Sequence, residues 1–145
     1  MKGERKERQK LTKEGVVFAI IQNGNILLEK RLDPGDKLQG YIIIPGGKTK
    51  ERESIWGTLS REIKEECDCI PKISSYLSTY SEQEDEINNV RHLFVVNAIE
   101  GEISNREPSK SEHIWAPLQK AREICEHPST QLYLDAIEKF IKGGE

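Results

Sequence analysis

Residues 45–69 read PGGKTKERESIWGTLSREIKEECDC, and this stretch decides the fold. A short apolar segment at residues 41–44 precedes it and stops at a proline and two glycines, which is typical of a strand that ends in a tight turn. Apolar residues then recur every four positions, which places them on one face of a helix; they are Ile55, Leu59 and Ile63. We therefore predict a strand at 41–44, a glycine turn and a helix over 54–67.

The predicted helix carries three acidic side chains on one face. Glu62, Glu65 and Glu66 are three and four residues apart, so at about 100° per residue they share a narrow stripe. Like charges at these spacings repel by roughly a few tenths of a kcal/mol per pair. Arg61 and Lys64 offset part of this repulsion, and a divalent cation would offset it better, since carboxylate oxygens suit Mg²⁺ and Mn²⁺. A solvated helix face with local ion pairs is the alternative interpretation.

The residues around this helix favour a metal and phosphate site over a solvated face. Two glycines allow the backbone to approach an anion closely or to offer a bare carbonyl to a metal. Lys48 follows them, where it can meet a phosphate, and Glu53 lies near the helix start, where the helix dipole favours negative charge. An acidic stripe, a glycine turn and a lysine together predict a site that binds a metal and a phosphate.

Residues 47–69 resemble the Nudix box of the Nudix hydrolase (MutT-like) family. The box has Gly47, five residues, Glu53, seven residues and then Arg-Glu-apolar-any-Glu-Glu, here residues 61–66. Two positions depart from it, because Asp68 stands at the late glycine of the box and Cys69 at the apolar position after it. Since aspartate tolerates a left-handed turn better than most residues, we expect a local cost in stability and no loss of chemistry.

Flanking segments extend the resemblance over residues 14–140: an LLxKR-like strand at 27–31, PGGK at 45–48 and ExxWxPL at 112–118. The resemblance implies Mg²⁺-dependent cleavage of the pyrophosphate in a nucleoside diphosphate linked to another group, with Mn²⁺ as an alternative ion. The implied metal ligands are Glu62, Glu65, Glu66 and the carbonyl of Gly46. Arg61 and Glu53 form an implied supporting pair. The expected substrate contacts are Lys48, Gly47 and Arg31.

The general base, which takes the proton of the attacking water, stays open between Glu65, Glu66 and Glu112. Trp115 is interpreted as a core aromatic rather than a platform for a nucleobase. Further candidates to line the pocket are Tyr41, Phe94 and Arg91.

The rest of the chain predicts a mixed sheet. Strands are expected at residues 15–22, 26–31, 73–80, 90–99 and 112–117, and helices at 117–125 and 129–141. Asn23-Gly24 predicts a hairpin turn between the first two strands, and the acidic residues 82–86 predict another turn. We expect an α/β (α+β) fold, an α/β/α sandwich in which helices flank the sheet. Residues 1–13 are predicted to be a flexible charged tail and residues 14–145 a single Nudix domain.

Composition narrows the partners. The chain has 145 residues, and 22 Lys and Arg against 25 Asp and Glu give a net charge of -3, which argues against a nucleic-acid polymer as partner. No apolar run reaches the roughly 18 residues of a membrane span, and the charged N-terminus does not predict a secretory signal. An odd count of three cysteines predicts a reduced, cytoplasmic protein without disulfides. A homodimer stays open, as Nudix domains are often dimers.

Markers of Nudix subfamilies leave one substrate class by exclusion. Residues 83–86 lack the proline often found in ADP-ribose hydrolases, and residues 85–87 lack the tyrosine often found in dinucleoside polyphosphate hydrolases. The upstream pattern of coenzyme A hydrolases is only partly echoed. We therefore expect a nucleoside triphosphate pyrophosphohydrolase, with oxidised or non-standard nucleotides as one candidate substrate. The alternatives are a hydrolase of ADP-ribose, a nucleotide sugar or coenzyme A, and a Nudix-fold module that binds nucleotides without cleaving them.

Overall fold

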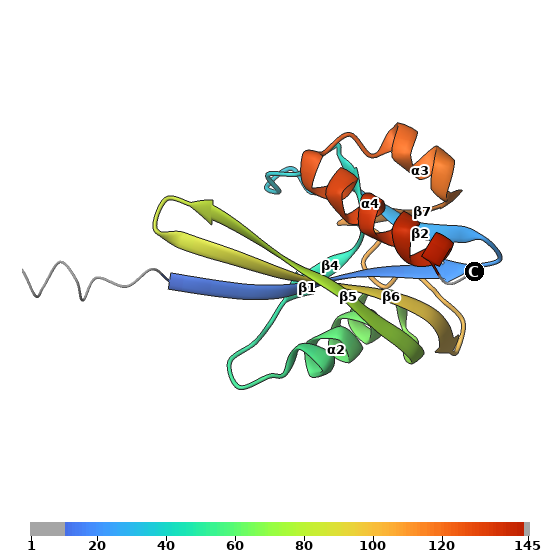
Figure 1. Cartoon of the computed structure of the whole chain (residues 1–145), viewed down its shortest axis with the longest axis horizontal. Coiled ribbons are helices and arrows are strands. Elements are labelled where there is room, and N and C mark those ends of the chain that lie inside the picture. Colours follow the sequence, from blue (N-terminus) through green and yellow to red (C-terminus); the bar gives the residue numbers. More distant parts are fainter. Residues whose placement is uncertain (1–10, 144–145) are drawn as a thin grey trace, which may run out of the picture.

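The computed structural model describes residues 11–143 as a mixed sheet with helices on both faces (Figure 1). Helix α2 covers one face, while α3 and α4 cover the other, which confirms the predicted α/β/α sandwich. The strands are β1 (Leu11–Gln22), β2 (Asn25–Arg31), β3 (Ile42–Ile43), β4 (Gly46–Lys48), β5 (Ile70–Glu84), β6 (Ile87–Glu100) and β7 (Ser111–Pro117). The helices are α2 (Ile55–Cys67), α3 (Leu118–Ile124) and α4 (Pro128–Gly143).

Strand β1 connects the two halves of the sheet. It pairs in parallel with β6, and antiparallel with β4 and β2 at different points along its length. Residues 15–20 of β1 are all buried, because this part of the strand is covered on both faces. Val16, Phe18 and Ile20 pack in the core beneath α2, whereas Val17 and Ala19 pack in the core beneath α3 and α4.

Several predicted boundaries are confirmed. Asn23 and Gly24 both have positive φ angles, of 53° and 79°, as a two-residue hairpin turn of this type requires. Helix α2 begins after Ser54, whose hydroxyl accepts a hydrogen bond from the Gly57 N–H, and ends at Asp68. Asp68 adopts the left-handed conformation (φ 58°, ψ 37°), so aspartate does here what the glycine of the box would do.

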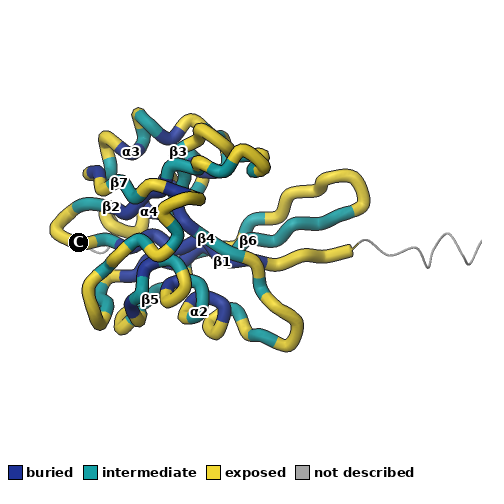
Figure 2. Tube along the Cα trace, turned by 180° about the vertical axis from the view of Figure 1, so that it is seen from behind, coloured by how far each residue is buried: buried dark blue, intermediate teal, exposed yellow. Residues whose placement is uncertain are grey.

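The strands near the N-terminus and in the β5–β6 hairpin are longer than predicted. Residues 11–13, predicted as part of a tail, belong to β1 and pair with β6, while residues 1–10 lie outside the described residues. Residues 82–84, predicted as part of an acidic turn, continue β5, and the turn narrows to Asp85 and Glu86. These extensions form an arm that projects from the body of the protein with mostly exposed or half-buried residues (Figure 2). Without a buried face, the arm lacks the apolar alternation that identifies a strand in a sequence.

The structure agrees with the prediction that the cysteines form no disulfides. Cys67, Cys69 and Cys125 are free and buried, so they behave as small core residues. Among the residues that the structure describes, no helix is both long and apolar enough to cross a membrane.

The predicted glycine turn is wrong in part, because Gly46 and Gly47 belong to strand β4, which pairs with β1. Glycine is a steric requirement at both positions. A Cβ on Gly46 would overlap the carbonyl oxygen of Val16 in β1, and a Cβ on Gly47 would overlap the carboxylate of Glu62. The first clash is with backbone, which cannot swing aside as a side chain can. Glycine at both positions lets β4 lie against β1 and α2 at once.

We expect Gly46→Ala to lower the free energy of unfolding by about 1–3 kcal/mol, the usual effect of overpacking. Gly35→Ala is the matched control, since a Cβ there would come no closer than 3.7 Å to another atom. Urea unfolding of both variants measures the difference. Equal stability of the two variants would contradict the steric argument.

Candidate active site

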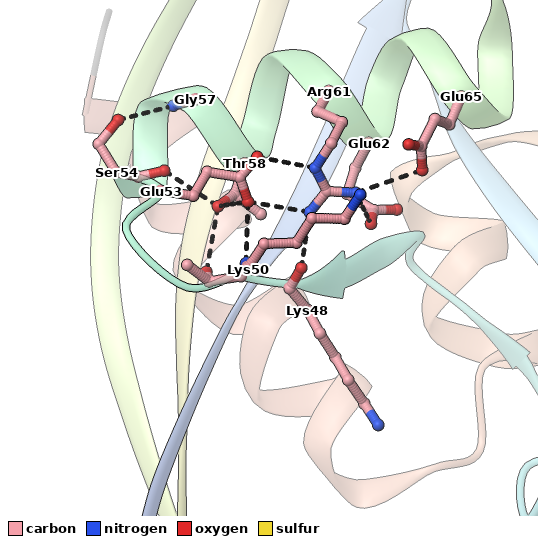
Figure 3. A network of polar contacts seen from close by, with 10 residues as sticks. Lys48, Lys50, Glu53, Ser54, Gly57, Thr58, Arg61, Glu62 and Glu65 are labelled. Atoms are coloured by element: carbon pink, nitrogen blue, oxygen red, sulfur yellow. Dashed lines mark hydrogen bonds and ion pairs between the residues drawn. The ribbon is translucent and has the colours of Figure 1, made fainter.

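The Arg61 side chain bonds to acidic residues of the box and to the strand that precedes the helix (Figure 3). Its Nε and Nη2 donate to the two carboxylate oxygens of Glu53, at 2.7 and 3.0 Å. Nη2 also donates to the carbonyl of Lys48 at 2.7 Å. Nη1 donates to Glu62 at 2.9 Å and to Glu65 at 3.2 Å. One guanidinium thus links strand β4, the loop before α2 and two box carboxylates.

Glu53 is the acid that this network holds most firmly. The Lys50 N–H and the Thr58 hydroxyl donate to Glu53 in addition to Arg61. These hydrogen bonds, that of Arg61 first, lower the pKa of Glu53 to about 2 from an ordinary value of 4.5. The structure therefore brings Arg61 and Glu53 together as the sequence predicted.

A cavity opens where α2 faces β2, β4 and the loop between β6 and β7. Four carboxylates and two cationic side chains line it. The lining residues are Glu29, Arg31, Gly46, Glu62, Glu66, Glu107, Lys110 and Ser111. Gly46, Glu62, Glu66 and Arg31 were predicted from the sequence as site residues, and they come from three separate segments of the chain.

Burial and the crowding of carboxylates shift the pKa of Glu66. Burial raises its pKa well above the ordinary 4.5, and a hydrogen bond with Glu62 and the charges of Glu29, Glu62 and Glu107 raise it further. Burial also raises the pKa of Glu29, although Arg31 opposes the shift. Such a group of acids, close together and partly buried, would be stabilised in its charged form by a cation.

Arg31 is fixed from two sides. Its Nη1 donates to the buried Glu29 at 2.8 Å, and its Nε donates to Asp36. Among the contacts of residues 11–143, Nη2 donates to no protein group. The guanidinium therefore keeps hydrogen-bonding capacity toward the cavity, as a contact for an anion requires.

Other predicted residues lie outside the cavity. Glu65 is half exposed and bonded to Arg61. The Lys48 side chain points away from the Arg61 network in Figure 3, and only its carbonyl takes part. Gly47 lies beside the Glu62 carboxylate and makes room for it. Glu112 is an exposed residue of β7, opposite Lys30 in β2.

The remaining candidates to line the pocket do not lie at the cavity. Phe94 is fully buried in the core beneath α2, so it cannot line a pocket. Trp115, interpreted from the sequence as a core residue, is 38% exposed. Tyr41 and Arg91 do not line the cavity.

Glu29, Glu107, Lys110 and Ser111 line the cavity but were not predicted from the sequence. A signal existed for Glu29, because it lies two residues before Arg31 on a strand and so faces the same side. Glu107 and Lys110 belong to a polar loop without periodicity, and only the folded chain places them.

The Glu53–Arg61 pair predicts a loss of stability in acid. Because the folded-state pKa of Glu53 is below its ordinary value, its contribution is complete above pH 4.5 and is lost as the pH falls toward about 2. We expect Glu53→Gln to flatten the fall of unfolding free energy in this range. Urea unfolding at a series of pH values measures the slope, with Glu51→Gln at a nearby exposed position as control. Identical slopes in wild type and Glu53→Gln would refute the assignment.

Glu66 predicts the opposite dependence. Because its folded-state pKa is raised, the unfolded chain ionises first, and stability falls as the pH rises above 4.5. Without divalent cations, Glu66→Gln should therefore be more stable than the wild type at about pH 8, and the gain should shrink toward pH 4.5. Thermal unfolding in a chelator measures it. A variant that is less stable than wild type at pH 8 would show that the carboxyl is not held protonated.

Known proteins resemble this chain in sequence and in fold. A family model described as the NUDIX domain matches residues 12–136. The ADP-ribose pyrophosphatase of Methanocaldococcus jannaschii is 33% identical over 97 residues, which are 65% of this chain and 56% of that protein. The chain thus spans little more than half the length of this curated relative.

Two solved structures have the same architecture. The solution structure of the E. coli ORF135 protein has a TM-score of 0.80 at 21% identity, and the match covers 92% of this chain and 94% of the ORF135 chain. The crystal structure of a MutT NUDIX hydrolase from Burkholderia pseudomallei has a TM-score of 0.74 at 25% identity, and the match covers 88% of this chain and 99% of the hydrolase chain. With the family model matching most of the chain and the box residues gathered around Arg61 and one cavity, the protein belongs to the NUDIX domain family.

Proposed function

We propose that this protein is a Mg²⁺-dependent hydrolase of diphosphate linkages in nucleoside diphosphate derivatives. The observation that carries the proposal is the cavity in which Glu62 and Glu66 of the box face Glu29, with Arg31 and Lys110 at its walls. Acids that attract a metal and cations that attract phosphate meet there. This is the combination that hydrolysis of a phosphoanhydride requires.

The donor set fits Mg²⁺ with its water shell and the substrate. No three acidic, histidine or cysteine side chains among residues 11–143 form a metal cage by themselves. Mg²⁺ usually takes one or two carboxylates and completes its six positions with water and phosphate oxygens. Glu62, Glu66 and the Gly46 carbonyl are the groups we assign to it, with Glu65 released from Arg61 as a further candidate. When bound, the ion neutralises phosphate charge and makes a coordinated water more acidic.

The protein side chains have separate tasks in this proposal. Arg31, held by Glu29, donates to a phosphate oxygen, and Lys110 adds a second positive charge at the cavity. Arg61 holds Glu62 in place and does not touch the substrate. Glu107 becomes a candidate for the proton acceptor, because it lies at the cavity whereas Glu112 faces solvent.

The substrate class has two candidates. We propose a nucleoside triphosphate first, because the markers of other subfamilies are missing downstream of the box and a MutT NUDIX hydrolase shares the fold. ADP-ribose is the second candidate, because the 33% identical relative is an ADP-ribose pyrophosphatase. We further propose that the protein works in the cytoplasm, since its three cysteines are free.

A substrate panel tests the proposed function. Nucleoside triphosphates, ADP-ribose, a nucleotide sugar and coenzyme A are incubated with Mg²⁺ or Mn²⁺, and the products are separated by chromatography. We expect a nucleoside monophosphate as one product, abolished by a chelator. Nucleotide binding by calorimetry with no product from any compound would favour a non-catalytic module instead.

Variants then locate the chemistry. We expect Glu66→Gln to lower kcat by at least about 100-fold, since it removes a group assigned to the metal. Glu123→Gln, an exposed acid on α3, is the matched control and should keep wild-type kcat. Glu107→Gln should lower kcat more than Glu112→Gln does. Wild-type turnover in Glu66→Gln would show that Glu66 is not a metal ligand in the reaction. A larger loss of kcat in Glu112→Gln than in Glu107→Gln would make Glu112 of β7 the proton acceptor.

A further inference from the structure

The loop of residues 101–110, between β6 and β7, supplies Glu107 and Lys110 to the cavity. It contains neither strand nor helix, so its position depends on individual contacts. Ile103 packs against the core beneath α2 and anchors its first half. The second half, which carries Glu107, needs other support.

The end of α2 gives part of that support. The last carbonyls of a helix have no partner within the helix. Here the Cys67 carbonyl accepts a hydrogen bond from the Ser104 N–H at 2.9 Å, and the Glu66 carbonyl accepts one from the Arg106 N–H at 3.1 Å. Glu66 therefore contributes its carboxyl to the cavity and its carbonyl to the loop.

Asp68 adds a contact that a glycine could not make. The Arg106 Nη1 donates to the Asp68 Oδ1 at 2.9 Å, and Lys64 pairs with the same oxygen at 3.1 Å. Asp68 occupies the left-handed turn at which the Nudix box has glycine. The departure from the box thus provides a carboxylate at the point where the loop meets the helix.

The contact at Arg106 passes directly to the cavity. Glu107 follows Arg106 in the chain, and its N–H donates to the Asn105 side chain at 2.9 Å. The Asn105 amide in turn donates to the Ser111 carbonyl at 2.8 Å, and the Lys110 N–H donates to the Glu107 carbonyl at 3.0 Å. Residues 105–111 therefore form one bonded unit with two attachments. Lys110 and Ser111 are held at β2 and β7, where the Leu32 N–H donates to the Lys110 carbonyl at 2.8 Å, whereas Arg106 holds the end that carries Glu107.

We propose that Asp68 and Arg106 are positioning residues that hold loop 101–110 against the end of α2 and so keep Glu107 at the cavity. The docking of the loop stands on its own contacts. Its consequence for turnover rests on the proposed function.

Hydrogen exchange measures the docking without any substrate. In Asp68→Gly the turn keeps a residue suited to it, so the unfolding temperature should not fall, while the Arg106 guanidinium loses its partner. We expect the amides of Ser104 and Arg106 to exchange up to about five times faster in Asp68→Gly and in Arg106→Gln, the range for an exposed ion pair. Lys64→Gln, which removes only the other partner of Asp68, is the matched control and should exchange as the wild type does.

Kinetics test the consequence at the cavity. If the pair acts through Glu107, Arg106→Gln should lower kcat severalfold, and the double variant Arg106→Gln/Glu107→Gln should be no slower than Glu107→Gln alone. Additive losses in the double variant would overturn the proposed route through Glu107.

The possible failures are distinguishable. Unchanged exchange at Ser104 and Arg106 in both Asp68→Gly and Arg106→Gln would overturn the docking role, as would equal acceleration in Lys64→Gln. A wild-type protein that cleaves no compound of the panel would refute the proposed function, while the exchange measurement would still decide the role of Asp68 and Arg106.

Discussion

The ion pair between Arg61 and Glu53 is the contact on which the arrangement of the site depends. Two of the carboxylates on α2 lie so close together that they repel, and Arg61 bonds to both while Glu53 fixes the guanidinium. Arg61 also bonds to the carbonyl of Lys48, which connects strand β4 to the helix. Strand β4, the loop before the helix and the helix face are thus bonded to one guanidinium.

The cavity shows a second consequence of concentrated charge. Burial and its acidic neighbours raise the pKa of Glu66, and a bound cation would oppose this shift. The net charge of -3 argues against a nucleic-acid polymer as partner. The site explains how an acidic chain can nevertheless take a phosphorylated substrate, since Arg31 and Lys110 stand beside the acids and a cation would change the sign of the local field.

Most of the fold could be predicted because local patterns carry it. The period of four in α2, the Asn23-Gly24 turn and the buried run in β1 each identify an element by themselves. The arm of β1, β5 and β6 could not be predicted, because neither of its faces is buried deeply enough to require alternating apolar and polar residues. In the site, the box residues were predictable from spacing on one helix, whereas Glu107 and Lys110 lie on a loop whose position depends on contacts with distant parts of the chain, among them the end of α2 and Leu32. Asp68 was predicted to tolerate its turn, but its contact with Arg106 depends on a residue 38 positions away.

Anomalous diffraction from crystals grown with Mn²⁺ and a non-hydrolysable nucleoside triphosphate analogue tests the central claim most directly. The account predicts an anomalous peak between the carboxylates of Glu62 and Glu66, with a phosphate oxygen within hydrogen-bond distance of Arg31. Mn²⁺ bound elsewhere, or a nucleotide bound with its phosphates away from this cavity, would contradict it.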